Sequence, residues 1–240
     1  MEETDVVNID KKINDELSKN GNTNLISNSG FSEQIFAIGD SHSIFFHKSM
    51  KIKQFWFGMS GLPVTIYTLN QSLNLYNVGN IVSTNKVKIN IKPNDYVMFF
   101  YGWNDIQKNI FLYAERDWQN EINRLVTKYI SLLIHFKNAY KINPIACCVY
   151  PALKVEPNEN TDNIHGSNIE RINYTIEYNK LLRIACQNNN IKLYDIYHLI
   201  VDKEGHIQKG YMTENDKTHL DHTNKFLRNC IDDYIVKLIN

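Results

Sequence analysis

The sequence lacks long hydrophobic runs, and it lacks an excess of charge of either sign. No apolar run approaches the roughly 18 residues that a membrane-spanning helix requires, so we expect no transmembrane segment. Lysine plus arginine number 26 and aspartate plus glutamate also number 26, which gives a formal net charge of zero. A chain without net positive charge is not expected to be a general binder of nucleic acid or of anionic membrane surfaces.

Cysteine is scarce, and its spacing excludes the common cysteine-rich metal motifs. The cysteines are Cys147, Cys148, Cys186 and Cys230, and no two of them have the C-x-x-C spacing of a zinc site. We interpret them as buried free thiols in a reducing compartment. Residues 1–20 are polar and acidic and contain no apolar signal segment, so the sequence predicts a cytoplasmic location. No motif indicates a cofactor.

The residues that are abundant indicate one folded domain. Hydrophobic residues make up 43% of the 240-residue chain, which is enough for a single large core. We expect residues 1–30, which are rich in asparagine, serine and charged side chains, to be a polar tail, and residues 31–240 to be the domain. The predicted strands are apolar runs rich in β-branched and aromatic residues, namely 34–39, 64–69, 95–101, 144–150 and 191–196.

Three longer segments have the spacing of amphipathic helices. In the clearest, residues 118–140, apolar side chains recur at about the 3.6-residue period of a helix. Residues 169–187 and 224–238 are the other two. Strands that alternate with helices are typical of a mostly parallel sheet covered on both faces. The sequence therefore predicts a single α/β domain.

Three short polar segments carry residue types that are used in catalysis. Gly39-Asp40-Ser41 follows the first predicted strand, Gly102-Trp103-Asn104-Asp105 follows the third, and Asp216-Lys217-Thr218-His219 precedes the last predicted helix. Because parallel strands end at the same edge of a sheet, we expect the first two segments to meet there. The last segment follows the fifth predicted strand and is able to fold back over that edge.

These residue types suit an acyl-transfer site. The hydroxyl of a serine such as Ser41 becomes a good nucleophile when a histidine takes its proton, and a third group must orient that histidine. Asp216 and His219 are three residues apart, so one turn of backbone can bring both to the serine. The Ser41 backbone N–H and the Asn104 side-chain amide are candidate donors for an oxyanion hole.

Each of these residues also has a purely structural interpretation. Serine is common at helix N-termini, so Ser41 can simply mark a strand-to-helix turn. Asn104 can be a turn former after a strand, and Asp216 can be the N-cap of the last helix. His219 and His222 form an H-x-x-H pair, but no third ligand at helical spacing supports a metal site, so we expect no metal.

Taken together, the three segments resemble the motif blocks of the SGNH (GDSL-type) hydrolases. That family's first block is G-D-S, its third is G-x-N-D and its fifth is D-x-x-H, and all three occur here in that order within residues 34–239. The resemblance implies a flavodoxin-like three-layer α/β/α sandwich with a five-stranded parallel sheet. It also implies that Ser41 is the nucleophile, that His219 is the base oriented by Asp216, and that Asn104 is an oxyanion donor.

Two departures from the family pattern affect the prediction. The family's leucine after the serine is His42 here, as in a GDSH variety that we associate with glycan and polysaccharide metabolism, and we interpret His42 as a packing or hydrogen-bonding residue. The family's second block supplies a glycine N–H to the oxyanion hole, but no glycine directly follows the predicted strand 64–69. The candidates for that donor are Asn70, Gln71 and Gly79.

The sequence therefore predicts a serine esterase that acts through a Ser-His-Asp triad and an acyl-enzyme. An O-acyl ester, with O-acetyl favoured, on a sugar or glycan is the expected substrate, and such a small-molecule or glycan ester is the expected partner. Two alternatives remain open. One is a sugar O-acyltransferase that uses the same triad, and the other is a non-catalytic glycan-binding descendant of the fold.

Overall fold

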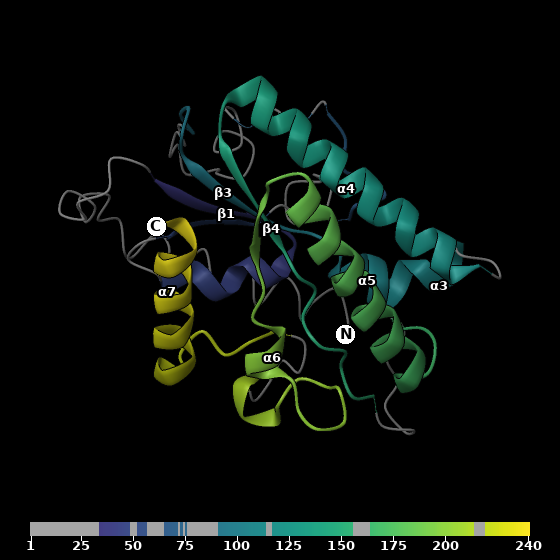
Figure 1. The fold of residues 1–240 in the computed structure, drawn as a ribbon. Coiled ribbons are helices and arrows are strands. Elements are labelled where there is room, and N and C mark those ends of the chain that lie inside the picture. The colour runs from purple at the N-terminus through teal and green to yellow at the C-terminus, as the bar shows by residue number, and fades with distance from the viewer. Residues whose placement is uncertain are drawn as a thin grey trace, which may run out of the picture.

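The computed structural model describes residues 34–48, 52–56, 65–71, 73, 75, 91–113, 117–155, 164–213 and 219–240. The predicted polar tail, residues 1–30, lies outside the described residues. A parallel sheet with the strand order β2-β1-β3-β4-β5 forms the centre of the fold (Figure 1). The strands are β1 (Ile35–Gly39), β2 (Ile52–Trp56), β3 (Tyr96–Phe100), β4 (Asn143–Cys147) and β5 (Lys192–Tyr194). This architecture confirms the predicted flavodoxin-like fold class.

The prediction of the second strand is wrong. Within the apolar run 64–69, residues 65–68 form a turn in which the Leu69 N–H donates to the carbonyl of Thr65 (2.9 Å). The second strand is β2, whose sequence IKQFW mixes polar and apolar residues and which lies at the edge of the sheet. An edge strand does not need the continuous apolar sequence of a central strand, so apolar content indicated the wrong segment.

The three predicted helices are present, and each begins at a side-chain cap. They are α4 (Trp118–Tyr140), α5 (Asn168–Asn188) and α7 (Lys225–Ile239). Asp117 caps α4, Ser167 and Glu170 form a capping box at α5, and Asn224 caps α7. The interpretation of Asp216 as the cap of the last helix is therefore wrong, although Asp216 itself lies outside the described residues. The shorter helices are η1 (Ser41–Lys48), η4 (Asp105–Asn109), α3 (Ile110–Tyr113), α6 (Tyr197–Ile200) and η5 (Lys209–Tyr211).

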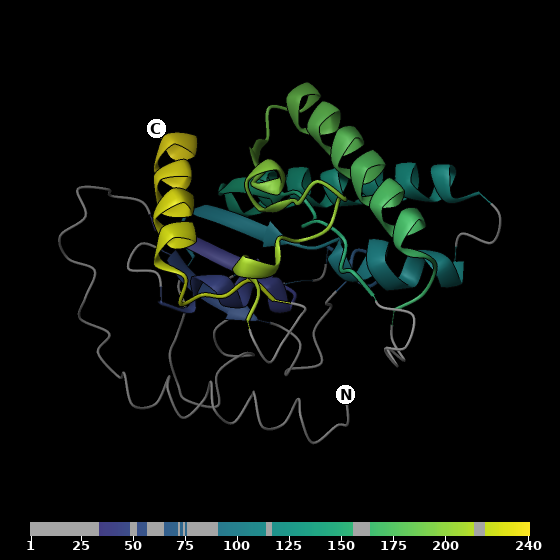
Figure 2. The same cartoon turned by 90° about the horizontal axis from the view of Figure 1, so that it is seen from below.

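The helices cover the two faces of the sheet, because consecutive strand residues point to opposite sides. On β3, the ring of Phe99 stacks on Phe136 of α4 (ring centroids 5.4 Å apart), whereas the ring of Phe100 contacts Phe46 of η1 (5.4 Å). On the η1 side, Tyr194 of β5 contacts both Phe46 and Tyr234 of α7. Accordingly α4 and α5 lie together on one side of the strands and η1 on the other (Figures 1 and 2).

The structure also tests the predictions about buried cysteines and about membrane-spanning helices. All of the cysteines are free, and Cys147, Cys148 and Cys186 are buried as predicted, whereas Cys230 is only half-buried. Within the described ranges, none of the helices combines the length and the apolar character needed to cross a membrane.

Candidate active site

The first polar segment begins with a glycine that no other residue can replace without strain. Gly39 ends β1 with a φ of +146°, and a Cβ atom added there would lie 2.1 Å from the carbonyl oxygen of Phe100. The next backbone N–H, that of Asp40, donates to the same oxygen (2.9 Å). The chain after β1 is therefore held tightly against the end of the neighbouring strand β3, which fixes where Ser41 begins.

Ser41 is the first residue of η1, but it does not cap that helix. The cap is Asp40, whose carboxylate oxygen Oδ1 accepts the N–H of His42 (3.0 Å). Ser41 is half-buried, and its hydroxyl makes no hydrogen bond to another of the described residues. The capping interpretation of Ser41 is therefore wrong, and its side chain has no structural role within the described part of the chain.

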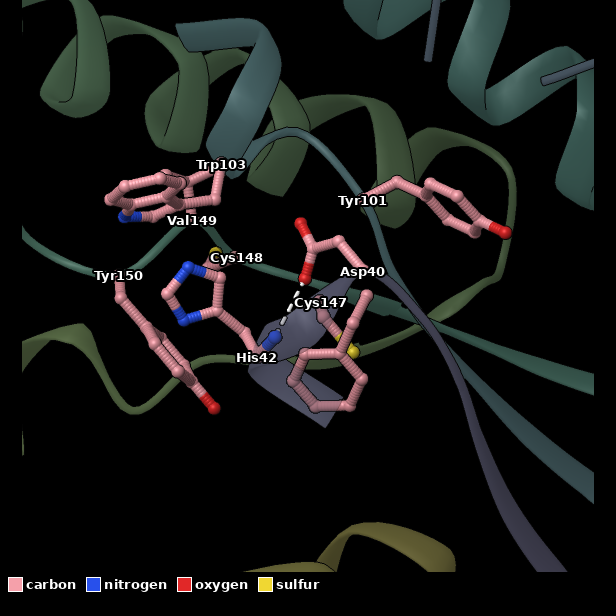
Figure 3. Close-up of a pocket in the computed structure, with 9 residues that line it drawn as sticks. Asp40, His42, Tyr101, Trp103, Cys147, Cys148, Val149 and Tyr150 are labelled. Carbon is pink, nitrogen blue, oxygen red and sulfur yellow. Dashed lines mark hydrogen bonds between the residues drawn. The ribbon is translucent and has the colours of Figure 1, made fainter. Parts of the chain in front are cut away.

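A small pocket lies at the carboxyl ends of the strands, and its lining includes the residues on either side of Ser41 in the sequence (Figure 3). Its empty volume is about 210 Å³, part of which is open to solvent. The lining comes from the segments that follow β1, β3 and β4, and it consists of Asp40, His42, Phe100, Tyr101, Trp103, Cys147, Cys148, Val149 and Tyr150. The two sequence neighbours of Ser41 thus form one wall, and large aromatic rings form much of the remainder.

The predicted base reaches this edge of the sheet. The ring of His219 lies against the ring of His42, with the centroids 5.2 Å apart. His42 also contacts Trp103 (4.6 Å) and Tyr150 (5.3 Å), so it lies among rings from three other segments (Figure 3). These contacts bring the first, third and fifth motif blocks together. They also agree with the interpretation of His42 as a packing residue.

Burial changes the ionisation of Asp40. Its side chain is 1% exposed, and desolvation by burial raises its pKa from 3.8 to about 8. The hydrogen bond from the His42 N–H and the charge of Lys108 partly oppose this rise, whereas the charge of Asp105 adds to it. At neutral pH the Asp40 carboxyl is therefore mostly protonated and uncharged, although it lies next to Ser41.

The second buried carboxyl, Asp105, organises the turn at residues 65–68. Its carboxylate oxygens accept the backbone N–H groups of Ile66 (2.8 Å) and Tyr67 (3.2 Å). Burial raises the pKa of Asp105 to about 6, and these two N–H groups are the largest opposing influence. Sequence reasoning did not assign a role to Asp105, although its place as the last residue of the G-x-N-D block was an available signal.

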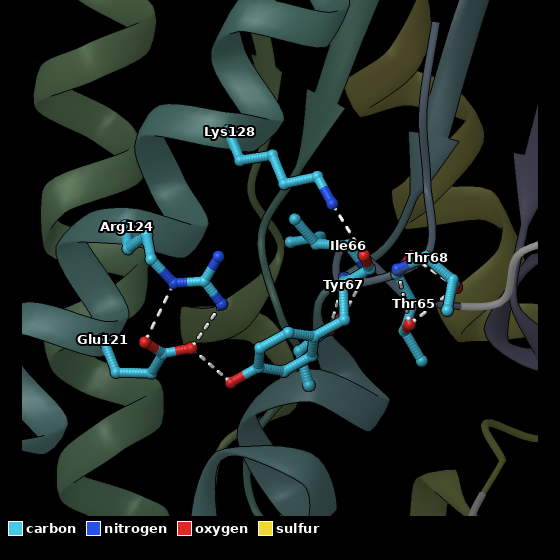
Figure 4. A network of polar contacts seen from close by, with 8 residues as sticks. Thr65, Ile66, Tyr67, Thr68, Glu121, Arg124 and Lys128 are labelled. Atoms are coloured by element: carbon cyan, nitrogen blue, oxygen red, sulfur yellow. Dashed lines mark hydrogen bonds and ion pairs between the residues drawn. The ribbon is translucent and has the colours of Figure 1, made fainter. Parts of the chain in front are cut away.

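Side chains from α4 hold the same turn from the other side (Figure 4). Lys128 Nζ donates to the carbonyl of Tyr67 (2.6 Å), and the Tyr67 hydroxyl donates to Glu121 (2.6 Å). Arg124 in turn donates to both carboxylate oxygens of Glu121 (2.6 and 2.9 Å). The turn is thus attached at both its backbone and its side chain, which explains why residues 65–68 do not extend as a strand.

Asn104 lies at the start of η4, a π-helix, and its side chain makes no capping hydrogen bond. A π-helical turn is uncommon and often marks a functional site. Gly102, two residues earlier, has a φ of +113°, and a Cβ there would lie 2.9 Å from the hydroxyl of Tyr178. Trp103 between them packs on His42. Asn104 is half-buried and follows directly from a residue of the pocket wall.

The three candidates for the second-block donor lie partly outside the described residues. Asn70 and Gln71 are exposed residues that follow the 65–68 turn and not a strand, and Gly79 lies outside the described residues. The second strand of the sheet is β2, which ends at Trp56, so the residues that follow this strand begin at 57. That segment, residues 57–64, contains Gly58 and Gly61 in the sequence and also lies outside the described residues.

Metal ligands do not gather at this edge in the described ranges. No group of three or more histidine, cysteine, aspartate or glutamate side chains there is arranged to hold a metal ion. Asp216, the predicted third member of the triad, lies outside these ranges.

Comparison with known proteins identifies the fold. No protein-family model and no curated protein matches the sequence. A protein of Bacteroides fragilis, provisionally described as an acylhydrolase, matches with a TM-score of 0.57 at 20% identity, over 88% of this chain and 90% of that one. A protein of Streptococcus pneumoniae, provisionally described as a platelet activating factor, matches with a TM-score of 0.53 at 16% identity, over 94% and 92%.

A GDSL-like lipase of Bacteroides thetaiotaomicron has a TM-score of 0.49 at 16% identity, over 84% of this chain and 89% of that one. The strand order and the likeness to the first two structures show that the chain has the fold of the SGNH (GDSL-type) hydrolases. At such identities the likeness establishes the fold, and the activity has to be argued from the site.

Proposed function

We propose that this protein is an SGNH-type serine esterase that cleaves an O-acyl ester, with a short acyl group such as acetyl, on a sugar or glycan. The observation that carries the proposal is the contact of His219 with His42, directly beside Ser41 at the carboxyl edge of the sheet and next to the pocket. His219 comes from the far end of the chain, yet its ring contacts the residue that follows Ser41, where a base for Ser41 would have to lie. The acylhydrolase description of the Bacteroides fragilis protein supports the same reaction class.

In the proposed reaction Ser41 Oγ attacks the ester carbonyl carbon while His219 takes the hydroxyl proton. The carbonyl π electrons move to oxygen, and the resulting oxyanion is stabilised by the Ser41 backbone N–H and the Asn104 amide. Collapse of the tetrahedral intermediate breaks the ester C–O bond, and His219 gives its proton to the departing sugar oxygen, which leaves as a hydroxyl. Water then attacks the acyl-enzyme by the same steps and releases the carboxylic acid. Asp216 would orient His219.

The uncharged state of Asp40 fits this chemistry. An ionised carboxylate next to Ser41 would repel the oxyanion that forms in the transition state. Because burial keeps the Asp40 carboxyl mostly protonated at neutral pH, that repulsion is largely absent. Asp40 still fixes the start of η1 through its bond to the His42 N–H, a bond that a neutral carboxyl can also accept.

The pocket supports a short acyl group. Its empty volume of about 210 Å³ includes space that is open to solvent, so the enclosed part is smaller. Trp103 and Tyr150 are both nearly fully buried and form part of its wall, so an acyl group bound there would meet aromatic rings. The indole N–H of Trp103 is buried without a hydrogen-bond partner among the described residues, and an aromatic face with a free donor also suits a sugar ring.

The proposal is tested by treating the protein with a fluorophosphonate and measuring its intact mass. Wild type should gain a single adduct, and Ser41→Ala should gain none. Ser43→Ala is the matched control, because Ser43 lies two residues further along the same helix and its hydroxyl is occupied by a hydrogen bond to the carbonyl of Asp40 (2.9 Å). An adduct on Ser41→Ala, or no adduct on folded wild type, would contradict the proposal.

Substrate and acceptor follow from a second measurement. Acetylated and longer-chain acyl sugars are offered to wild type, and the released acid and any new sugar ester are quantified. Release of free acetate with a rate that falls as the acyl chain lengthens is the expected result. Formation of a new sugar ester would instead identify an acyltransferase that uses the same residues. Binding of the sugar without turnover and without a fluorophosphonate adduct would identify a glycan-binding protein.

A further inference from the structure

His42 is held more firmly than a surface residue of a short helix would be. Its ring is 4% exposed and lies between Trp103, from the segment after β3, and Tyr150, from the segment after β4. Because these two rings belong to separate loops, they restrain the imidazole from different directions. Figure 3 shows the ring between them, facing the pocket.

The backbone on either side of this ring is fixed as well. The His42 N–H donates to Asp40 Oδ1 (3.0 Å), and the next residue, Ser43, donates to the carbonyl of Asp40 through both its N–H (3.1 Å) and its hydroxyl (2.9 Å). Asp40 in turn is bound to the end of β3. The position of the His42 ring is therefore determined by the central strands of the sheet.

His219 lies in a segment whose backbone makes contacts with residues 211–213. An isolated bridge pairs Met212 with Leu220, the Thr213 N–H donates to the carbonyl of His219 (3.3 Å), and the Asp221 N–H donates to the carbonyl of Tyr211 (2.8 Å). These backbone contacts fix where the chain passes, but a backbone carbonyl contact leaves the χ1 and χ2 angles of a side chain undetermined. The side chains against which the imidazole packs therefore contribute to its orientation, together with the proposed partner Asp216.

We propose that His42 is a positioning residue for His219, and that its aromatic ring is the rigid surface that holds the His219 imidazole ready to take the proton of Ser41. The centroid separation of 5.2 Å and the tilt of 44° between the two rings are within the usual range of aromatic contacts. This inference rests on the proposed function. The inference gives a physical reason for a histidine at position 42, where the SGNH hydrolases that the sequence resembles have leucine. A leucine side chain fills space but offers no flat ring.

The test compares four variants by two rates. The variants His42→Leu and His42→Gln remove the ring, and His42→Phe keeps a ring without nitrogen atoms. Phe46→Leu is the control: it removes another buried ring of the same helix, one that packs on Phe100 and Tyr194. The first rate is that of fluorophosphonate addition to Ser41, which needs no knowledge of the substrate. The second is kcat, measured with KM on a chromogenic acetate ester, and thermal denaturation reports folding in parallel.

A loosened base should slow the reaction without weakening substrate binding. We expect His42→Leu and His42→Gln to lower both rates about 10- to 100-fold with KM within about twofold of wild type, as small misplacements of catalytic groups do. His42→Phe should stay within about threefold of wild type, because the ring contact persists. Phe46→Leu should lower the melting temperature and leave both rates near wild type. The glutamine variant keeps the comparison possible if the leucine variant does not fold.

Each other outcome overturns the inference. Wild-type rates in both ring-less variants would show that His219 does not depend on His42. An equal loss in His42→Phe would assign the effect to the imidazole nitrogens and not to the ring contact. An equal loss of rate in Phe46→Leu would show that any lost core packing in this helix slows the reaction, and that His42 has no specific role. If wild type gains no adduct, the proposed function itself is refuted. If wild type is labelled but the His42 variants react at the wild-type rate, only the role of His42 is refuted.

Discussion

Replacement of Asp40 by asparagine should remove a pH-dependent loss of stability. In the unfolded chain this carboxyl loses its proton near its ordinary pKa of 3.8, whereas in the folded chain burial raises the pKa to about 8. Between these values the folded state binds one proton more than the unfolded state. The free energy of unfolding therefore falls as the pH rises from about 4 to about 8, and the loss is complete above pH 8.

The size of the effect follows from the same values. Each pKa unit corresponds to about 1.4 kcal/mol, so ionisation of Asp40 should lower the free energy of unfolding by about 4 kcal/mol between pH 5 and pH 9. Asparagine has nearly the same shape and is able to accept the His42 N–H, but it does not titrate. Any constant cost of its buried NH2 group is the same at every pH. The difference in stability between Asp40→Asn and wild type should therefore grow in favour of the variant by about 4 kcal/mol over this range.

Urea denaturation of both proteins at pH 5, 6, 7, 8 and 9 measures this difference directly. Subtracting the wild-type value at each pH cancels the titration of all groups that the two proteins share. A difference that changes by less than about 1 kcal/mol from pH 5 to pH 9 would refute the argument. It would mean that water or a neighbouring side chain solvates the Asp40 carboxylate and that the residue is ionised beside Ser41.

Three further predictions concern the frame of the site. Gly39→Ala should destabilise the protein by about 3 kcal/mol or more by urea denaturation, because the added Cβ would meet the carbonyl oxygen of Phe100 at 2.1 Å, and wild-type stability would contradict this. Asp105→Asn should cost about 1–3 kcal/mol at pH 5 and about 1.4 kcal/mol less at pH 8, because burial raises the Asp105 pKa to about 6 and its ionisation destabilises the folded wild type, and a cost that grows with pH would contradict this. Asn224→Ala should lower stability by about 1 kcal/mol through loss of the α7 cap, and an unchanged urea midpoint would show that the cap contributes nothing.

Helices and central strands were predictable because their signals are local. The helix prediction 118–140 coincides with α4, since apolar residues at a 3.6-residue spacing and a preceding Asp117 act within a few residues of chain. The central strands β1 and β3 are buried on both faces, so their sequences are continuous apolar runs. Edge strand β2 has no such signal, and the 65–68 turn, which was mistaken for a strand, is held by Asp105 and Lys128 from far along the chain.

For the site, the sequence by itself determined which residue types stand at the carboxyl edge of the sheet. Ser41 and Asn104 were expected at one edge because each follows a predicted parallel strand, whereas the structure shows that these two strands are neighbours. Only the tertiary structure decided that Asp40 is kept neutral and that His42 lies against His219. Desolvation depends on every atom packed around a carboxyl, and a contact between residues so far apart in the chain depends on how the whole sheet is covered. Neither quantity is encoded by any short stretch of sequence, and so both emerge only when the chain is folded.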